Sequence, residues 1–385
     1  MNYLGMSQDD LEKWGGYWTA REISQQPAVW TDVERIMARC SAALQIYLNP
    51  LLSRKDLRIV LTGAGSSSFI GECLAPALAR RLGVRVEAVA TTDLVGSPQS
   101  WLAPSAPVLL VSFARSGNSP ESIAALTLAE QIVPECHHLI VTCNPEGALY
   151  RSGQTLRNSH VVLLPEETND RGFAMTSSFT GMLLAAALAF DVLTADAPAA
   201  FSRCSEHALA GVPLAASLAR RGFERVVYLG SKEFKGLARE AALKMLELSD
   251  GRVVALAETP LGFRHGPKTI VNAKTLVVMF LCNDPYTRRY EMDVLGELRA
   301  DAVAARVLAL TAGDSRLSRH ADEIRVPGAA SAPDLELCFP YAVFAQTFAL
   351  LQSLALGLRP DTPNAKGVVN RVVQGVSIYS WTSSR

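Results

Sequence analysis

The sequence predicts an α/β fold made of two tandem, doubly wound parallel-sheet domains with helices on both faces. Two observations carry this prediction. Short apolar runs alternate with helical patterns along most of the chain, which is typical of a parallel sheet covered by helices. Apolar runs of the first half also recur in the second half about 167 residues later, which indicates an internal duplication.

The duplication involves three pairs of predicted strands. In chain order, the matched pairs are 58–63 with 225–230, 108–111 with 275–278, and 139–142 with 308–311. Further strands are expected at 86–90 and 161–164 in the first copy, and at 253–256 and 324–326 in the second. A period this long indicates two similar domains rather than a solenoid.

Helices are expected on both sides of the duplicated region. Before it, Thr31-Asp-Val-Glu34 fits a capping box, and apolar residues then recur at helical spacing and end at Asn49-Pro50. A last helix is expected near 341–356. The predicted parts are an N-terminal helical segment (1–54), a first sheet domain (55–198), a second sheet domain (199–358) and a polar C-terminal tail (359–385), with the boundary between the copies near 195–201.

Composition narrows the functional class. Lys plus Arg and Asp plus Glu number 37 each, so no basic field exists for a nucleic-acid backbone or an anionic membrane. The longest apolar run, Met182 to Phe190, is too short to cross a bilayer, and the first residues do not resemble a signal peptide. Seven cysteines without paired spacing indicate reduced thiols. We therefore expect a cytoplasmic protein with neither nucleic-acid nor membrane partners.

Hydroxyl-rich turns follow two predicted strands of the first copy. The turn Gly63-Ala-Gly-Ser-Ser-Ser68 follows the first strand, and Arg115-Ser-Gly-Asn-Ser119 lies between a strand and a helix. Small hydroxyls and unpaired helix N–H groups at the positive end of a helix dipole favour an anion, most often a phosphate. The forked guanidinium of Arg115 could bind two phosphate oxygens. Ordinary helix capping is the alternative for both turns.

The second copy lacks this chemistry. Its corresponding turns read Gly230-Ser-Lys-Glu-Phe234 and Cys282-Asn-Asp-Pro-Tyr286, without a serine–glycine pair. One phosphate site per chain is therefore expected, in the first copy. A dinucleotide site is disfavoured there, because Ser68 stands where the third glycine of the dinucleotide fingerprint is needed.

Two residues of the second copy are candidates for proton transfer. Glu247 ends a predicted helix among apolar neighbours, where a carboxylate can serve as a base, although a solvated helix-end glutamate is the alternative. His265 lies between glycine and proline on a predicted loop and could move protons at neutral pH. No metal site is expected at Cys136-His-His138, because adjacent residues at the start of a strand point in opposite directions.

Together these motifs resemble the sugar isomerase (SIS) domain superfamily, which implies flavodoxin-like sheet domains. The resemblance covers about residue 35 to the C-terminus. The sequence is similar to the isomerase half of glucosamine-6-phosphate synthase. It is more similar to the galactosamine-6-phosphate deaminase/isomerase group, also called tagatose-6-phosphate ketose/aldose isomerases. The segments Phe113–Ser122 and Glu167–Thr176 indicate that group.

The resemblance also implies roles for individual residues, a homodimer or larger homo-oligomer, and neither cofactor nor metal. The serines that contact the sugar phosphate would be Ser66, Ser67, Ser116 and Ser119. Thr176 would lie in the segment that closes over the substrate. Glu247 would move a proton between C1 and C2, His265 would open the ring from the neighbouring subunit, and Lys366 would reach the region of C2.

Two departures from the family pattern bear on these roles. Ala114 replaces a serine before the phosphate-binding pair, so Arg115 would grip the phosphate more than a third hydroxyl does. Gly262 replaces an acidic residue before the histidine loop, so the group that tunes His265 stays open.

The expected activity is deamination and isomerisation of galactosamine 6-phosphate to tagatose 6-phosphate. Only about 50 residues precede the first sheet, so no amidotransferase domain to supply ammonia is expected, and the reaction would run toward ammonia release. An aldose/ketose isomerase of a neutral hexose 6-phosphate is the nearest alternative. A non-catalytic sugar-phosphate sensor is the alternative from another class.

Overall fold

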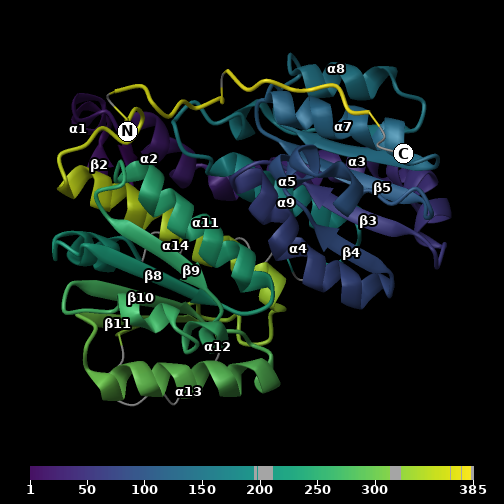
Figure 1. The fold of residues 1–385 in the computed structure, drawn as a ribbon. Helices are drawn as coiled ribbons and strands as arrows, with labels where there is room; N and C mark the ends of the chain where they lie inside the picture. The colour runs from purple at the N-terminus through teal and green to yellow at the C-terminus, as the bar shows by residue number, and fades with distance from the viewer. Residues whose placement is uncertain (195–196, 198–210, 313–321, 365, 374, 383–385) are drawn as a thin grey trace. The chain divides into compact units, whose positions relative to one another are not determined.

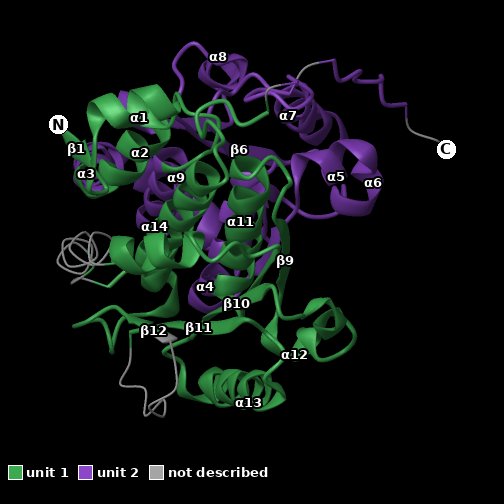
Figure 2. Cartoon of the chain, turned by 90° about the vertical axis from the view of Figure 1, so that its left-hand side faces the viewer, with its two compact units in different colours: residues 1–28, 170–176, 193–365 green, residues 29–169, 177–192, 366–385 purple. Residues whose placement is uncertain are grey.

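The structure is a computed structural model that describes residues 1–194, 197, 211–312, 322–364, 366–373 and 375–382. The chain forms two compact units (Figure 2). Unit 1 contains residues 1–28, 170–176 and 193–365, and unit 2 contains residues 29–169, 177–192 and 366–385. The boundary predicted near 195–201 lies, apart from Ala197, outside the described residues. The four-part division of the chain therefore stays a prediction.

Unit 2 is built on a five-stranded sheet in which every neighbouring pair is parallel (Figure 1). Its strands are β3 (Arg58–Thr62), β4 (Arg85–Ala88), β5 (Val108–Ala114), β6 (Cys136–Thr142) and β7 (Ser159–Leu163). They lie in the order β4-β3-β5-β6-β7. The strand order thus reverses between β3 and β5, the place where doubly wound folds bind ligands.

Helices cover both faces of this sheet. They are α4 (Ser66–Leu82), α5 (Thr91–Gly96), α6 (Pro98–Trp101), α7 (Pro120–Ile132), α8 (Ala148–Thr155), the 3₁₀ turn η1 (Glu166–Thr168) and α9 (Ser177–Ala189). On one face, Val60 and Leu110 belong to a core cluster with Leu94 of α5. On the other, Gly71 of α4 lies so close to Leu61 that an added Cβ would be 2.9 Å from the Cβ of Leu61. Both faces are buried, which explains the continuous apolar runs.

Unit 1 repeats this plan. Its strands are β8 (Arg225–Gly230), β9 (Val254–Glu258), β10 (Thr275–Phe280), β11 (Arg306–Thr311) and β12 (Asp322–Arg325). They lie in the order β12-β11-β10-β8-β9, again with every pair parallel. Relative to chain order this is the arrangement of the first sheet. The prediction of two doubly wound parallel sheets is confirmed.

Successive side chains along the strands of the second sheet also point to two buried faces in turn. Its helical elements are α11 (Glu233–Leu248), α12 (Pro260–Phe263), η2 (Pro267–Ile270), α13 (Pro285–Asp301) and α14 (Asp334–Ala355). Val227 packs in one cluster with Phe263 of α12. Tyr228, the next residue, stacks on Phe280 with ring centroids 6.1 Å apart, and Phe280 stacks on Tyr341 of α14 at 5.7 Å. The period of two places each sheet face against its own helices.

Among the described residues, α14 alone is long and apolar enough to cross a membrane. However, 89% of its apolar stretch is buried inside the protein. We therefore interpret α14 as a core helix of unit 1.

The N-terminal region differs from the prediction. A short hairpin of β1 (Asn2–Tyr3) and β2 (Met6–Ser7) precedes α1 (Gln8–Trp14), α2 (Tyr17–Ser24) and α3 (Gln26–Leu52). The capping box at Thr31 was wrong, because α3 begins at Gln26 and Thr31 lies inside it. Pro27 is tolerated there, since the first N–H groups of a helix have no intrahelical partner. The predicted end at Pro50 was also wrong, because α3 continues through Pro50 to Leu52.

The same turn leaves the first strand of each sheet. A Cβ on Gly63 would lie 2.6 Å from the carbonyl carbon of Ser67, and one on Gly230 would lie 2.2 Å from the carbonyl oxygen of Phe234. Two residues later the backbone has φ 55° and ψ −127° at Gly65, and φ 53° and ψ −122° at Lys232. Corresponding positions of the two copies therefore share one backbone conformation, although only one of them keeps the glycine.

We predict that Gly230→Ala destabilises the protein, because its methyl group would overlap the backbone of the following helix. The expected loss is about 1–3 kcal/mol or more in the free energy of unfolding. Gly296→Ala, in the interior of α13 with no atom within 4 Å of the added Cβ, is the control and should gain about 0.5–1 kcal/mol. Urea denaturation measures both; equal midpoints would contradict the close packing at Gly230.

Candidate active site

The two hydroxyl turns of the first copy lie at the same edge of their sheet. Strands β3 and β5 are parallel neighbours, and Thr62 at the end of β3 pairs with Ser112. Ser66 and Ser67 begin the helix after β3, and Ser116 follows β5 after one residue. These serines therefore lie beyond the carboxyl ends of the two strands between which the strand order reverses.

The N-terminus of α4 carries no side-chain cap. Ser66, Ser67 and Ser68 are buried in its first turn. Within this turn the backbone N–H of Ser67 donates to Ala64 O at 3.1 Å, and that of Ser68 to Gly65 O at 2.9 Å. A helix of 17 residues thus directs the positive end of its dipole toward a serine-lined turn.

Some polar groups of the turn after β5 form hydrogen bonds within the turn. Ser119 is the N-cap of α7: its Oγ accepts from the N–H of Ser122 at 3.2 Å and lies 2.6 Å from the Oγ of Ser122. Ser116 Oγ accepts from the N–H of Asn118 at 3.3 Å. Ser119 therefore caps α7. The phosphate contacts of Ser116 and Ser119 stay predictions.

Arg115 contacts the C-terminal tail. Its buried guanidinium donates from Nη2 to the backbone carbonyl of Arg371 at 2.7 Å, and Arg371 donates to the side chain of Asn169 at 3.3 Å. Lys366, in the same tail, is exposed. Arg115 therefore ties the end of β5 to the tail, and its predicted grip on a phosphate is untested.

In the second copy a carboxylate of the chain itself occupies the corresponding region. Asp334, the first residue of α14, accepts from the Nζ of Lys232 at 2.7 Å and from the N–H of Asn283 at 2.6 Å. Lys232 follows β8 and Asn283 follows β10, the strands between which the order reverses. An internal anion is thus held where the first copy has its hydroxyl turns, which supports one phosphate site per chain.

Glu247 lies in the last turn of α11 and pairs with Lys244. Lys244 is only 1% exposed, and its Nζ also lies 3.6 Å from a carboxylate oxygen of Glu240. The ammonium group compensates two carboxylates on one face of the helix and orients the Glu247 side chain. Sequence analysis missed Glu240 and Lys244. The available signal was that Lys244 follows Glu240 by four residues and precedes Glu247 by three, which places all three on one helix face.

The loop that carries His265 is anchored on both sides. Arg264 donates to Glu297 of α13 at 2.6 Å, and Lys268 forms ion pairs with Glu297 and with Asp301. His265 itself is exposed, and its backbone N–H donates to Gly262 O at 2.9 Å. A scaffold therefore presents the imidazole at the surface of unit 1, as the sequence predicts.

An acidic group does approach Gly262, although not from its own position. A Cβ on Gly262 would lie 2.8 Å from Oε1 of Glu258, the last residue of β9, and 2.7 Å from Oγ1 of Thr259. Glu258 also accepts from the backbone N–H of Thr259 at 2.7 Å. Position 262 has no carboxylate of its own, but Glu258, four residues earlier in the chain, brings one to this loop.

Thr176 is fully buried at the end of the 170–176 segment. Its N–H donates to Asp170 Oδ2 at 2.8 Å and its hydroxyl to Asp170 Oδ1 at 3.1 Å. The predicted residues are therefore divided between the units. Thr176, Glu247 and His265 belong to unit 1, whereas Ser66, Ser67, Arg115, Ser116, Ser119 and Lys366 belong to unit 2.

A second cluster corrects one argument from the sequence. Cys136 and His138 are two residues apart on β6 and share a face, so that their Sγ and Nε2 atoms lie 3.5 Å apart. His138 Nε2 lies 2.7 Å from Glu130, and Asn158 Nδ2 donates to the same carboxylate oxygen at 2.8 Å. Burial, then Glu130, raises the pKa of Cys136 to about 12, so its thiol is neutral. The cluster joins α7 to the amino end of β6, at the opposite edge from the hydroxyl turns.

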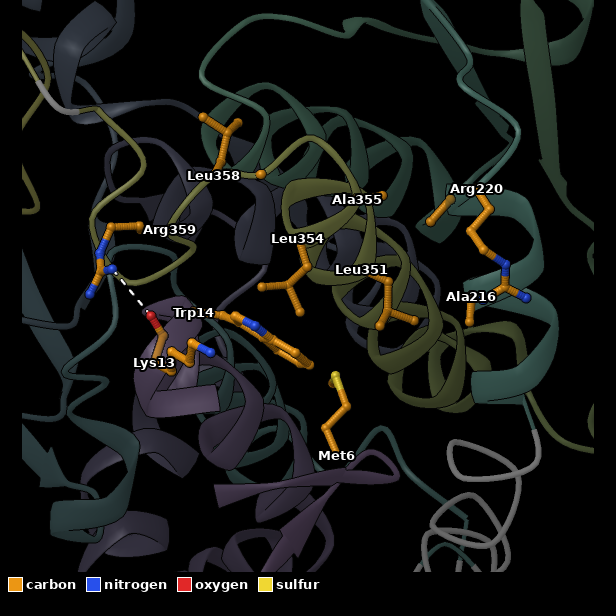
Figure 3. A pocket seen from close by; sticks show the side chains of 12 residues that line it. Met6, Lys13, Trp14, Ala216, Arg220, Leu351, Leu354, Ala355, Leu358 and Arg359 are labelled. Carbon is orange, nitrogen blue, oxygen red and sulfur yellow. Dashed lines mark hydrogen bonds between the residues drawn. The ribbon is translucent and has the colours of Figure 1, made fainter. Parts of the chain in front are cut away.

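Unit 1 also contains a cavity of about 450 Å³, shown in Figure 3. Trp14, Leu351 and Leu354 line its apolar part, and Arg359 on its rim donates to the backbone carbonyl of Lys13 at 3.3 Å. None of the predicted site residues lines it.

Comparisons with known proteins agree with this geometry. The SIS domain model matches residues 51–191, which include the whole first sheet. D-galactosamine-6-phosphate deaminase AgaS of Escherichia coli is 47% identical over 371 residues, 95% of this chain and 96% of that protein. The chain belongs to the SIS-domain family of AgaS proteins.

Two further comparisons extend over almost the whole chain. A Streptomyces coelicolor protein, provisionally named D-galactosamine-6-phosphate deaminase AgaS, is 50% identical over 94% of this chain and 95% of its own. The crystal structure of tagatose-6-phosphate ketose/aldose isomerase from Escherichia coli is 43% identical, with a TM-score of 0.87, over 96% of this chain and 98% of that one. These two relatives therefore match almost the whole chain and not the first sheet alone.

In this AgaS-family protein we predict that Lys244→Met costs about 3–5 kcal/mol in the free energy of unfolding, because it leaves two carboxylates without their buried cation. Lys235→Met, on an exposed position of the same helix, is the matched control and should change stability by less than about 0.5 kcal/mol. Thermal or urea unfolding measures the difference. Equal stability of the two variants would show that the buried ion pair contributes nothing.

Proposed function

We propose that this protein converts D-galactosamine 6-phosphate to tagatose 6-phosphate and ammonia in the cytoplasm. The observation that carries the proposal is the match of 95% of this chain to an Escherichia coli protein named for that deaminase activity. The hydroxyl turns at the strand reversal and the ion-paired Glu247 support it, since the reaction needs an anchored phosphate and a positioned base.

The proposed binding step uses the phosphate as a remote handle. The hydroxyls of Ser66, Ser67, Ser116 and Ser119 and the uncapped N-terminus of α4 hold it. In this scheme Arg115 fixes the tail and adds positive charge beside the turn, and Thr176 belongs to the segment that covers the sugar. Binding energy from the unreactive end then orients the reacting carbons.

The proposed chemistry begins with ring opening, in which His265 transfers the proton between the ring oxygen and the anomeric hydroxyl. Glu247 removes the proton from C2 of the open-chain amino sugar, which gives an enolamine, and returns a proton to C1. The product is a ketose iminium ion. Lys366 stabilises the oxygen substituents near C2, and water adds to C2 to release ammonia and leave the ketone. No cofactor is required, because every step is a proton transfer or a hydrolysis.

We predict that Glu247→Gln lowers kcat by about 100- to 10,000-fold, because an amide cannot accept the C2 proton. A coupled assay of ammonia released from galactosamine 6-phosphate measures the effect. The control is Glu224→Gln, an exposed glutamate of the same unit that should retain full activity. Ammonia release by Glu247→Gln at the parental rate would exclude Glu247 as the base.

One relative favours a second activity. The Escherichia coli structure named tagatose-6-phosphate ketose/aldose isomerase is 43% identical to this chain. A neutral hexose 6-phosphate would share the enolisation step but lack the nitrogen. A panel of amino and neutral hexose 6-phosphates, assayed for ammonia and for ketose, separates the two activities. Binding of sugar phosphate without either product would indicate a sensor.

We also propose a homodimer in which His265 serves the partner's substrate. The expected result of coexpressing Glu247→Gln and His265→Gln chains is recovery of about a quarter of the parental activity, because half of randomly assorted dimers carry one intact site. The control is a mixture of the two variants purified separately and assayed before subunits exchange. No recovery in coexpressed dimers would place both residues in one chain's site.

A further inference from the structure

A buried carboxylate fastens the 170–176 segment to the N-terminal helix α2. Glu22 of α2 accepts hydrogen bonds from the backbone N–H groups of Arg171 and Gly172, the latter at 3.2 and 3.1 Å to its two oxygens. Glu22 and the N–H of Gly172 are both buried. Because a buried N–H needs a partner, removal of the carboxylate would release the segment or leave this donor unsatisfied.

Close packing and a cation–π contact strengthen this attachment. A Cβ on Gly172 would lie 2.9 Å from Glu22 Oε2 and 3.0 Å from Thr19 Oγ1, so glycine alone permits the approach. The guanidinium of Arg171 lies over the ring of Trp18, 4.8 Å from its centroid. Three kinds of contact therefore join consecutive residues of the segment to one face of α2.

The other end of the segment is held from within. Asp170 accepts from both the N–H and the hydroxyl of Thr176, which closes the segment into a loop. Gln346 of α14 donates to the carbonyl of Thr176 at 3.5 Å, and Gln26 donates to Gln346 at 2.7 Å. The position of Thr176 thus depends on a loop whose second and third residues are attached to Glu22.

The start of α2 holds a second stretch of chain. Gly16, its N-cap residue, offers no side-chain cap, and Asp361 supplies one instead. The carboxylate of Asp361 accepts from the N–H groups of Trp18 and Thr19 at 3.0 and 2.8 Å and from the Thr19 hydroxyl at 2.7 Å. Asp361 lies five residues before Lys366 in the sequence. Helix α2 therefore holds the chain close to two predicted substrate residues.

We propose that Glu22 is a positioning residue that holds the 170–176 segment, which is expected to cover the substrate, in its observed conformation. The catalytic consequence rests on the proposed function. The attachment itself involves only described residues of unit 1 and can be tested without substrate.

The charge of Glu22 bears on the attachment. Burial and the neighbouring Asp170 raise the pKa of Glu22 from 4.5 to about 8, against the hydrogen bonds from Arg171 and Gly172. Asp361 adds to the increase, so the charged side chains that shift the pKa of Glu22 are Asp170 and Asp361. The raised pKa means that the folded state keeps this proton where the unfolded state releases it. The contribution of Glu22 to the free energy of unfolding is therefore fully present below the unfolded pKa of 4.5 and is lost as the pH rises through about 8.

The first test measures hydrogen exchange of the peptide 170–176 in the full chain without substrate. Glu22→Ala should speed exchange of the amides of residues 171 and 172 by about tenfold or more. Gly172→Ala should do the same from the other side of the contact, with Glu22 intact. Glu12→Ala, an exposed glutamate of the adjacent helix α1, should leave exchange unchanged. Parental exchange in both contact variants would overturn the proposal.

The second test measures ammonia release. Glu22→Ala and Gly172→Ala should each lower kcat/KM by about 10- to 100-fold, and the double variant should lose no more than the worse single one, because both remove one contact. Additive losses would overturn the proposal. Glu22→Gln keeps an acceptor oxygen for the N–H groups of residues 171 and 172, so its kcat/KM should stay within about twofold of the parental value near pH 6. A loss of kcat/KM in Glu22→Gln as large as that in Glu22→Ala would also overturn it.

The two tests separate this inference from the proposed function. If the parent releases no ammonia from galactosamine 6-phosphate but the exchange results hold, the activity is wrong and the attachment stands. If the parent is active and the exchange of residues 171 and 172 ignores Glu22, the activity stands and the inference fails.

Discussion

Both units depend on how tightly their first strand turns into the following helix. Gly63 and Gly230 lie against the backbone of that helix, at distances that no side chain allows. The turn therefore delivers the N-terminus of a long helix directly to the edge at which the strand order reverses. Lys232 keeps the backbone conformation of Gly65 at a strained, positive φ, and its side chain forms an ion pair with Asp334.

The two copies share one fold but place different polar side chains at corresponding positions. The helix after β3 opens among buried serines, whereas the corresponding helix after β8 opens beside Lys232 and an internal carboxylate. The second helix instead bears its reactive group at the far end, where Lys244 holds Glu247. The first copy thus places serines at the start of this helix, and the second places an ion-paired carboxylate near its end.

The sequence was sufficient for the strands, because parallel strands buried on both faces read as continuous apolar runs. It also placed the hydroxyl turns and the loop of His265, which depend on local glycine, proline and serine. The sequence could not predict contacts between segments that lie far apart in the chain. One example is the hydrogen bond from Arg115 to the carbonyl of Arg371, and another is the one from Gly172 to Glu22. Both join residues far apart in the chain, and no periodic pattern in the sequence indicates them. The predicted start of α3 was too late, because the capping box at Thr31 was a more conspicuous signal than the proline in the first turn of the helix.

The burial of α14 has a consequence for how the protein is made. This helix packs its aromatic side chains on the sheet of unit 1, and it follows all five strands of that sheet in the chain. Until α14 leaves the ribosome, this sheet face is covered only in part, by α11, whose Phe234 also packs against Phe280. During that interval the nascent chain exposes apolar surface that is prone to aggregation, and complete folding of unit 1 must await the synthesis of α14.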